Sequence, residues 1–345
     1  MTDLPVEAAG PGTFDVIDLM TGYQAAAALT AAARLGVCDL LARGPADAAR
    51  VAAELGTEPL ATRALLDALV GLGLLVADGP PDSPTYVGTV ASHRLASGGD
   101  LRLVAEKEAF FAREWLDLAE SVRTGTPRLA PWRERLVTDP VRAREFLRAL
   151  VVLADETGPD LASLVGRGDQ VADLGGGFGA YALPMAVAGA QVDLVDLPTV
   201  AGWASAELST RASARGWGHA LHRVTPLSVD LLAPGAFDVL GRGRYDVVLL
   251  SHLLHDHDDI DCRRLVAAAA DLARPGGRVV VFELPGDPPG AFGPMFDLMM
   301  RVETPGRARR RSELAALLSG AGLVDVRVLE QFAAPAGVLE GVRPD

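Results

Sequence analysis

Apolar positions along the chain repeat with two different periods. In roughly the first 160 residues they recur every three or four positions, which predicts amphipathic helices over residues 23–41, 46–55, 57–75, 103–122 and 142–156. From about residue 161, short apolar runs alternate with helical segments, which indicates an α/β domain with a doubly wound sheet. Its strands are expected at residues 170–174, 191–195, 222–227, 245–250, 278–283, 324–329 and 337–342.

Proline and glycine mark the breaks between these segments. A turn-rich stretch, residues 79–84, precedes a short apolar strand at residues 85–87, so three helices followed by a two-stranded wing predict a winged-helix module. Pro184 falls in the helix after the first strand of the sheet; either that helix is kinked or its regular part begins later. The first ten to twelve residues mix proline, glycine and acids and are expected to form a loose arm.

The charge of the winged-helix module argues against DNA. Residues 1–100 contain five arginines, no lysine and twelve acids, a net charge of −7, and the whole chain carries −13. Phosphate binding needs clustered basic groups, so we expect no nucleic-acid partner. The apolar helices instead predict a surface that another copy of the chain covers.

The composition indicates a large globular protein. The chain has 345 residues, 49% of them hydrophobic, which is enough for two domains with substantial cores. Its apolar runs are shorter than the roughly 18 residues of a membrane span, and the N-terminus has no signal-peptide pattern, so no membrane partner is expected. The two cysteines do not indicate a disulfide framework, which favours a cytoplasmic location.

A glycine loop follows the first strand of the sheet. Residues 171–179 read Val-Ala-Asp-Leu-Gly-Gly-Gly-Phe-Gly, with Asp173 before Gly175, Gly177 and Gly179. Glycines allow a sharp turn and the close approach of a nucleotide cofactor, and Asp196, which ends the next apolar run, is suited to accept two ribose hydroxyls. By itself the loop also fits a dinucleotide pattern.

The motifs that follow narrow the choice of cofactor. They are Asp196-Leu197-Pro198, Asp230-Leu231, Ser251 at a strand end, Leu254-His255-Asp256, the turn Arg274-Pro-Gly-Gly277, and Glu283. With these motifs the chain resembles, over nearly its whole length, the class I S-adenosylmethionine-dependent methyltransferases, and more narrowly the small-molecule O-methyltransferases shared by plants and bacteria.

The resemblance implies a Rossmann-like catalytic domain at residues 161–345, preceded by a winged-helix dimerisation domain at 1–100 and a helical linker at 101–160 that contributes to the acceptor pocket. It implies a homodimer that uses S-adenosylmethionine to methylate a hydroxyl of an aromatic or polycyclic natural product. The residues expected to bind the cofactor are Asp173, Gly175, Gly177, Gly179, Asp196, Leu197, Asp230, Leu231 and Ser251.

His255 is the candidate general base. Imidazole titrates near neutrality, and His255 follows a strand end, where ligands bind in open α/β sheets. The resemblance favours this role over a histidine that merely caps the next helix. Asp256 and Glu283 are expected to orient the imidazole and to stabilise its cation.

Aromatic and sulfur-containing side chains are candidates for the acceptor pocket. We expect Phe111, Trp115, Leu150, Met295 and Met299 to contact the acceptor, because the family places its substrate between the linker helices and the nucleotide domain. The alternative for each of them is ordinary core packing.

Two positions depart from the family pattern. His257 follows the His-Asp pair where much of the family has tryptophan, and Ala308 stands where a second glutamate often flanks the catalytic histidine. Glu303 could replace that acid, or Glu283 could suffice alone. Ala308 also leaves open a relative that uses bound S-adenosylmethionine for decarboxylation, hydroxylation or a pericyclic step. A ligand-sensing winged-helix regulator is a more remote alternative.

Two charged clusters allow further interpretations. A metal site could draw on His252, His255 and His257 with Asp256, Asp258 and Asp259, but helical geometry points His257 elsewhere, so we expect no metal. Residues 301–311 contain five arginines: Arg301, Arg307, Arg309, Arg310 and Arg311. They form either a solvated loop or a site for an acidic acceptor.

Overall fold

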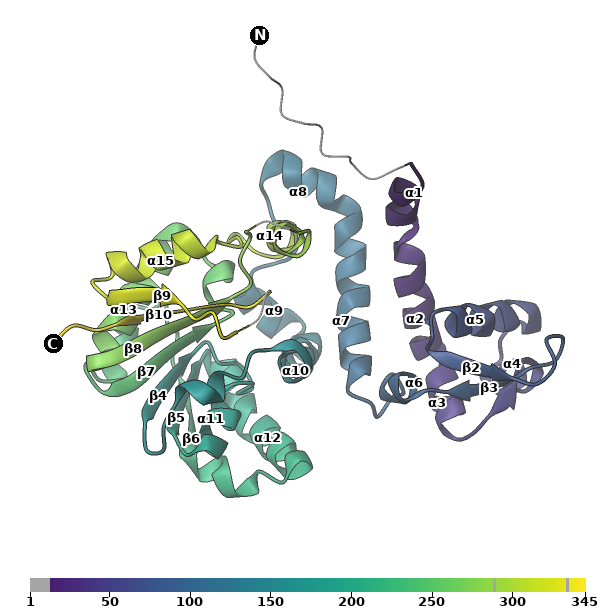
Figure 1. Cartoon of the computed structure of the whole chain (residues 1–345), viewed down its shortest axis with the longest axis horizontal. Coiled ribbons are helices and arrows are strands. Elements are labelled where there is room, and N and C mark those ends of the chain that lie inside the picture. Colours follow the sequence, from purple (N-terminus) through teal and green to yellow (C-terminus); the bar gives the residue numbers. More distant parts are fainter. Residues whose placement is uncertain (1–12, 288–289, 333–334) are drawn as a thin grey trace, which may run out of the picture. The chain divides into compact units, whose positions relative to one another are not determined.

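The protein divides into two compact units, Met1–Phe111 and Ala112–Asp345 (Figure 1). The computed structural model describes residues 13–287, 290–332 and 335–345. The loose arm expected at the N-terminus lies outside these residues.

The first unit combines helices with a small antiparallel sheet in the order β1-β3-β2. The arrangement of helices before a pair of strands agrees with the winged-helix prediction, and β1 adds a third strand. Its elements are α1 (Thr13–Thr21), α2 (Tyr23–Leu35), α3 (Val37–Ala42), β1 (Ala46–Asp47), α4 (Ala48–Leu55), α5 (Pro59–Gly71), β2 (Leu75–Asp78), β3 (Thr85–Gly88), α6 (Val90–Arg94) and α7 (Leu101–Glu114), which continues past the boundary of the unit.

Three of the predicted helical segments are longer than the helices that form there. The helix expected at 23–41 breaks at Gly36, whose φ of 87° ends α2 and begins α3. Asp47 belongs to a strand and caps α4, because its side chain accepts a hydrogen bond from the Arg50 backbone N–H at 2.8 Å. The helix expected at 57–75 ends at Gly71, and Leu75 starts β2.

The second unit begins with three helices that precede its sheet. The helix expected at 103–122 is broken by a 3₁₀ turn at Trp115–Asp117, and the one at 142–156 is confirmed. The sequence pattern missed α9. These helices are α8 (Leu118–Thr124), α9 (Trp132–Thr138) and α10 (Pro140–Thr157).

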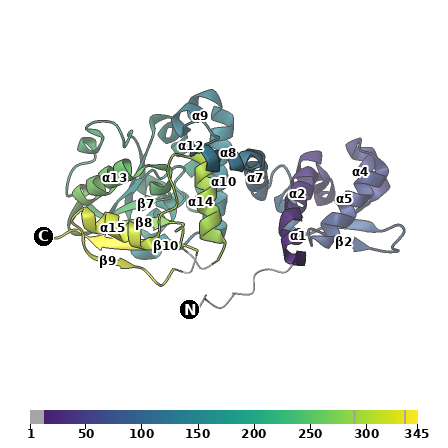
Figure 2. The same ribbon diagram turned by 90° about the horizontal axis from the view of Figure 1, so that it is seen from above.

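A seven-stranded sheet forms the centre of the second unit, in the order β6-β5-β4-β7-β8-β10-β9. The strands pair in parallel except β10, which is antiparallel to both neighbours. In Figure 2, β9 and β10 lie together at one end of the sheet. The strands are β4 (Gln170–Leu174), β5 (Gln191–Asp196), β6 (Val224–Ser228), β7 (Tyr245–Ser251), β8 (Ala273–Glu283), β9 (Val324–Val328) and β10 (Gly337–Val342).

The strand order reverses between β4 and β7. From β4 the chain builds outward through β5 and β6, and it then returns to place β7 on the other side of β4. In open α/β sheets the crevice beyond the carboxyl ends of the strands at such a reversal is where ligands bind. The predicted glycine loop follows β4, and His255 follows β7.

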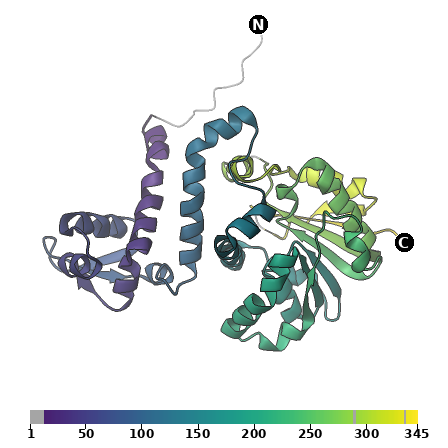
Figure 3. The same cartoon turned by 180° about the vertical axis from the view of Figure 1, so that it is seen from behind.

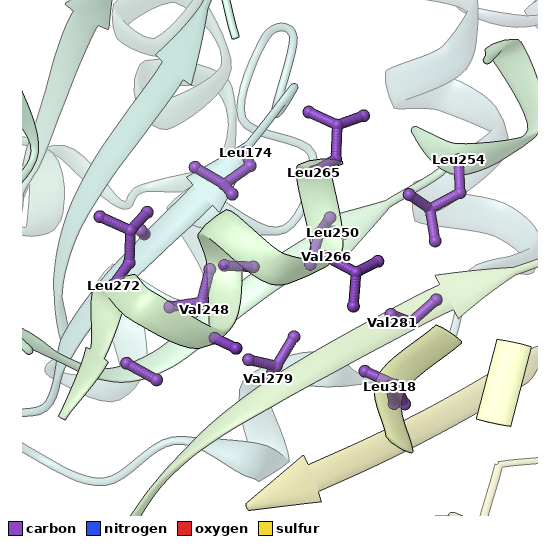
Figure 4. Packing of buried hydrophobic residues seen from close by; sticks show 14 of the residues in the cluster. Leu174, Val248, Leu250, Leu254, Leu265, Val266, Leu272, Val279, Val281 and Leu318 are labelled. Carbon is purple, nitrogen blue, oxygen red and sulfur yellow. The ribbon is translucent and has the colours of Figure 1, made fainter. Parts of the chain in front are cut away.

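Helices cover both faces of this sheet (Figure 3). Alternate strand residues point to opposite faces, so Val247 and Leu249 join one apolar core and Val248 and Leu250 the other. The first core contains α11 (Ala182–Ala188) and α12 (Pro198–Arg215), and the second contains α13 (Asp259–Leu272) and α15 (Arg311–Gly320). Figure 4 shows the second core, where Leu265 and Val266 of α13 face Val248 and Leu250.

The backbone shows how the chain accommodates Pro184 and the turn at residues 274–277. Pro184 lies in the first turn of α11, which begins at Ala182, so its missing N–H removes no helical hydrogen bond. The Arg274-Pro-Gly-Gly277 turn is a bulge inside β8. Tyr245 pairs with Ala273 and Val247 with Arg278, and Gly276 adopts a φ of 73°.

Over the residues that the structure describes, the helices are each too short or too polar to cross a membrane.

Leu265→Ala should destabilise the second unit by about 2–5 kcal/mol, because it removes a buried side chain from the core between α13 and the sheet. Ile260→Ala is the matched control on the same helix. Ile260 is 62% exposed, so its truncation should change the free energy of unfolding by less than about 0.5 kcal/mol. Equal losses in denaturant titrations would contradict the packing described for this face.

Candidate active site

The glycine loop closes the carboxyl end of β4. Gly175, Gly177 and Gly179 adopt φ values of 71°, 57° and 71°, a left-handed conformation that disfavours other residues. A Cβ on Gly175 would lie 2.8 Å from Leu253, whereas one on Gly177 would meet nothing nearer than Leu147 at 3.7 Å. Gly177 is therefore required by backbone conformation and leaves open space beside the loop, which suits a bound ligand.

Asp196 is held against this loop at the end of β5. Its Oδ2 accepts a hydrogen bond from the Gly177 N–H at 2.8 Å, and its Oδ1 accepts one from the Leu197 N–H at 2.7 Å. Burial raises the pKa of Asp196 to about 6, although these two hydrogen bonds oppose the shift. Each carboxylate oxygen keeps a free lone pair, so the pair of oxygens can accept the two hydroxyls of a ribose.

Asp173 is fully buried beneath the loop. Among the described residues its two carboxylate oxygens have no hydrogen-bond partner, and a Cβ on Gly176 would lie 2.5 Å from Oδ2. Burial, with a smaller effect of the charge on Asp196, raises the pKa of Asp173 to about 7. A buried acid with unused acceptors fits a ligand that brings a cation or a donor, as the ammonium of S-adenosylmethionine does.

Strand register brings further predicted residues to the same edge of the sheet. Leu174 of β4 pairs with Leu250 of β7, so Ser251 lies beside the start of the glycine loop. Asp196 pairs with Ser228 of β6, which leads into Asp230 and Leu231. The Asp230 carboxylate accepts hydrogen bonds from the guanidinium of Arg133, a contact that the motif does not predict, and Leu231 packs against the core.

His255 lies in a 3₁₀ turn, η5 (Leu254–Asp256), after β7. Its Nδ1 is 2.6 Å from Oε2 of Glu283, the last residue of the neighbouring strand β8. Oε1 of Glu283 accepts hydrogen bonds from the N–H groups of Leu253 at 3.1 Å and Leu254 at 2.7 Å. The buried carboxylate thus holds both the imidazole and the backbone of its turn, and it leaves Nε2 as the nitrogen that can exchange a proton.

Negative charge surrounds the imidazole. Asp256 Oδ1 lies 3.7 Å from Nε2, and Glu303 is also near enough to act on the ring. Burial lowers the pKa of His255, but Glu283 and the other two acids outweigh it and raise the pKa to about 9. Burial opposes ionisation of Glu283, yet the adjacent imidazolium keeps its pKa below the usual range.

Two rings next to His255 were not assigned from the sequence. The Phe296 ring of α14 (Phe292–Glu303) stands edge-on to the imidazole, with ring centroids 5.2 Å apart. The His252 ring packs on Phe282 at 4.4 Å, and burial lowers the pKa of His252 to about 4, so it is neutral. Phe296 could have been found because positions 296, 299, 300 and 303 share one face of a helix.

The metal interpretation involves a different set of residues. Candidate ligand atoms of His252, His255 and Glu283 lie within 4.8 Å of one another. This group contains Glu283, whereas the candidates from the sequence were His252, His255 and His257 with Asp256, Asp258 and Asp259. In the structure, the short contact between His255 Nδ1 and Glu283 already occupies one atom of each of those two groups.

The residues predicted for the acceptor pocket have different surroundings. Met299 packs against the cluster that contains Phe296, whereas Met295 is exposed. Phe111 is buried in the first unit, under the ammonium of Lys107, and Trp115 forms the 3₁₀ turn after α7. Leu150 lies exposed on α10. Of these residues, Met299 packs against the cluster that contains Phe296, whose ring contacts His255.

The region of the missing acid contains a buried ion pair. Ala308 is buried against Phe296 and Met300. Glu303 is also buried and pairs with Arg135 of α9 at 3.2 Å. The Arg135 guanidinium lies over the Trp132 ring, 4.9 Å from its centroid. Glu303, the last residue of α14, is therefore an acid of this region that acts on His255.

Most of the clustered arginines pair with acids of the chain. Arg309 is buried, only 3% exposed, and the others lie at or near the surface. The pairs are Arg301 with Asp297, Arg307 with Glu313 and Asp259, Arg309 with Asp259, and Arg311 with Asp287. Of the five, Arg310 is exposed and has no ion pair within the described part of the chain.

Comparisons with known proteins agree with this arrangement. The O-methyltransferase dimerisation domain matches residues 17–98, and the O-methyltransferase domain matches residues 161–324. The chain is 32% identical to 3-hydroxy-5-methyl-1-naphthoate 3-O-methyltransferase of Streptomyces sahachiroi, over 94% of each chain.

Two solved structures share the fold. Human N-acetylserotonin methyltransferase in complex with SAM superposes with a TM-score of 0.82, at 23% identity, and covers 99% of this chain and 100% of that one. PigF with SAH gives a TM-score of 0.75 at 25% identity, covering 96% and 100%.

Fold and site together define a methyltransferase that depends on S-adenosylmethionine. The chain belongs to the O-methyltransferase family, with its dimerisation domain and its catalytic domain both present. The resemblance inferred from the motifs, and the fold class that it implied, are confirmed.

The imidazole of His255 should titrate with a pKa of about 9 in the ligand-free protein. Glu283→Gln should return it towards 6.5, because the neutral amide no longer stabilises the cation. Histidine carbon chemical shifts followed across pH provide the measurement, with His255→Ala identifying the resonance. Because the folded-state pKa is raised, the stabilisation from this pair is complete below about pH 6.5 and is lost as pH rises through about 9.

Proposed function

We propose that this enzyme methylates a phenolic or enolic hydroxyl of a flat aromatic natural product, with His255 as general base. The observation that supports the proposal is the contact between His255 and Glu283 at the sheet edge that carries the glycine loop. A base at this edge is what a hydroxyl acceptor requires, because a neutral hydroxyl is a weak nucleophile.

Glu283 fixes the tautomer of the base. Its carboxylate accepts the proton of His255 Nδ1, so Nε2 takes the acceptor's proton. A phenol has a pKa near 10, close to the value of about 9 for His255, so the proton moves between groups of similar basicity. At pH 7 only roughly one imidazole in a hundred is neutral in the ligand-free protein, so turnover should rise with pH.

S-adenosylmethionine, when bound, supplies a methyl group on a positively charged sulfur. For its binding we assign the ribose to Asp196, the methionyl portion to the loop of Gly175, Gly177 and Gly179, and the ammonium to Asp173. We assign the adenine to the segment that contains Leu197, Asp230 and Leu231, with Ser251 at the border of the site. Proximity to the acceptor accounts for much of the rate.

An aromatic acceptor suits the surroundings of the base. Phe296 of α14 presents its ring to His255, and the Met299 thioether packs against the cluster that contains Phe296. The Streptomyces sahachiroi relative is named for a naphthoate, which has fused aromatic rings. Phe111, Trp115, Leu150 and Met295 remain predicted contacts of the acceptor. We also place the enzyme in the cytoplasm, since both Cys38 and Cys262 are free thiols.

His255→Ala should lower kcat roughly a hundredfold to ten-thousandfold, because the acceptor loses its base. The affinity for S-adenosylmethionine, measured by calorimetry, should stay nearly unchanged, because the imidazole acts on the acceptor. His219→Ala is the control and should retain wild-type turnover. His219 lies in the 3₁₀ segment Gly218–Arg223, outside the turn that carries His255.

Wild-type turnover by His255→Ala at neutral pH would overturn the assignment of the base. Mass spectrometry of the product then separates two causes. A methylated product whose yield rises with pH through the acceptor's own pKa would indicate unaided ionisation. An altered but unmethylated product would indicate a decarboxylation, a hydroxylation or a pericyclic step, the alternatives that Ala308 left open.

The chain should form a homodimer through its first unit. Leu19 and Met20 of α1 are 76% and 73% exposed, and Ile17 and Tyr23 are exposed beside them in the sequence, so an apolar surface faces solvent in the isolated chain. Light scattering should give the mass of a dimer, and the double substitution of Leu19 and Met20 by glutamate should shift it towards the monomer. A wild-type monomer at micromolar concentration would contradict this prediction.

A further inference from the structure

The turn that carries His255 is held from one side by Glu283 and from the other by a separate segment, residues 304–309. Three backbone carbonyls of residues 254–257 accept hydrogen bonds from this segment. They belong to Leu254, His255 and His257.

Arg309 makes the strongest of these contacts. Its Nη1 donates to the Leu254 carbonyl at 2.6 Å, and its Nη2 donates to the His257 carbonyl at 2.9 Å. The same guanidinium pairs with Asp259 at 2.7 Å, and only 2% of the side chain is exposed. A planar, fully charged group with donors in fixed directions can span two carbonyls in a way that a lysine ammonium cannot.

Thr304 and Gly306 contact the carbonyl of His255. Thr304 Oγ1 donates to it at 3.4 Å, and the Gly306 N–H donates to Thr304 Oγ1 at 3.0 Å. A Cβ on Gly306 would lie 2.0 Å from the same carbonyl oxygen. The absence of a side chain at Gly306 therefore lets the segment lie directly against the turn.

We propose that Arg309 is a positioning residue for the base, and that with Gly306 it fixes the backbone of residues 254–257 so that the imidazole stays on Glu283. This inference rests on the proposed role of His255. Arg309 acts through the turn, since its donors reach carbonyls and Asp259 and not the ring.

Arg309→Met should lower the limiting kcat, measured at a pH above the acidic limb of the profile, on the order of tenfold to a hundredfold, because a small displacement of a catalytic group has a cost of this size. The affinity for S-adenosylmethionine should be unchanged. Loosening the contact with Glu283 should also move the acidic limb of the pH profile to lower pH, since Asp256 and Glu303 would be the main charges left facing the ring. Arg309→Lys should restore part of kcat, and Arg310→Met, at the exposed neighbouring arginine, should match the wild type.

A double-mutant cycle separates positioning from general structural support. In the His255→Ala background, Arg309→Met should cause no further loss of kcat, because there is no base left to position. Multiplicative losses, or a wild-type kcat and pH profile for Arg309→Met, would overturn the proposal while leaving the role of His255 intact. Wild-type turnover by His255→Ala would instead remove the proposed function itself.

Gly306→Ala gives a second, independent route in case Arg309→Met does not fold. Its methyl group would push the His255 carbonyl away without removing any charge. The expected result is again a lower kcat, an acidic limb at lower pH and an unchanged cofactor affinity. If all three values matched the wild type, the proposal would be contradicted, because a displaced turn would then have no effect on the base.

Discussion

The carboxylate of Glu283 is the point at which sheet, turn and candidate base are joined. Glu283 is the last residue of β8. Its carboxylate accepts hydrogen bonds from two backbone N–H groups of the segment after β7 and contacts the imidazole of His255. Removing a buried charge from such an arrangement leaves its partners unsatisfied, which is why one residue can govern both the shape of the turn and the basicity of the ring. The raised pKa of His255 and the lowered pKa of Glu283 are two consequences of the same contact.

The sheet makes this contact possible. The order of the strands reverses between β4 and β7, so the glycine loop after β4 and the turn after β7 open at one edge. The pairing of Ser251 with Phe282 places Glu283 just beyond the end of β7. Cofactor loop, base and orienting acid thus come from three neighbouring strands, and their spacing is set by main-chain hydrogen bonds.

The sequence predicted the parts of the structure that depend on local patterns. The strands of the sheet, the glycine loop and the pairing of His255 with Glu283 followed from apolar runs and motifs near strand ends. Breaks inside helical patterns were missed, because Gly36 and the turn at Trp115 interrupt segments whose apolar spacing continues across them. The contacts of Arg309 and Glu303 were missed for another reason. They depend on how a distant loop packs against the turn, and a run of arginines is ordinarily solvated.

The acids at the glycine loop, Asp173 beneath it and Asp196 beside it, have a consequence for how binding is measured. Asp173 and Asp196 have pKa values raised to about 7 and about 6, so near neutrality both states of the pair are populated. A ligand that carries positive charge favours the ionised carboxylates and expels the proton. Heat released on binding will then include the protonation of the buffer, and it will differ between buffers of unlike ionisation enthalpy even when the affinity is the same.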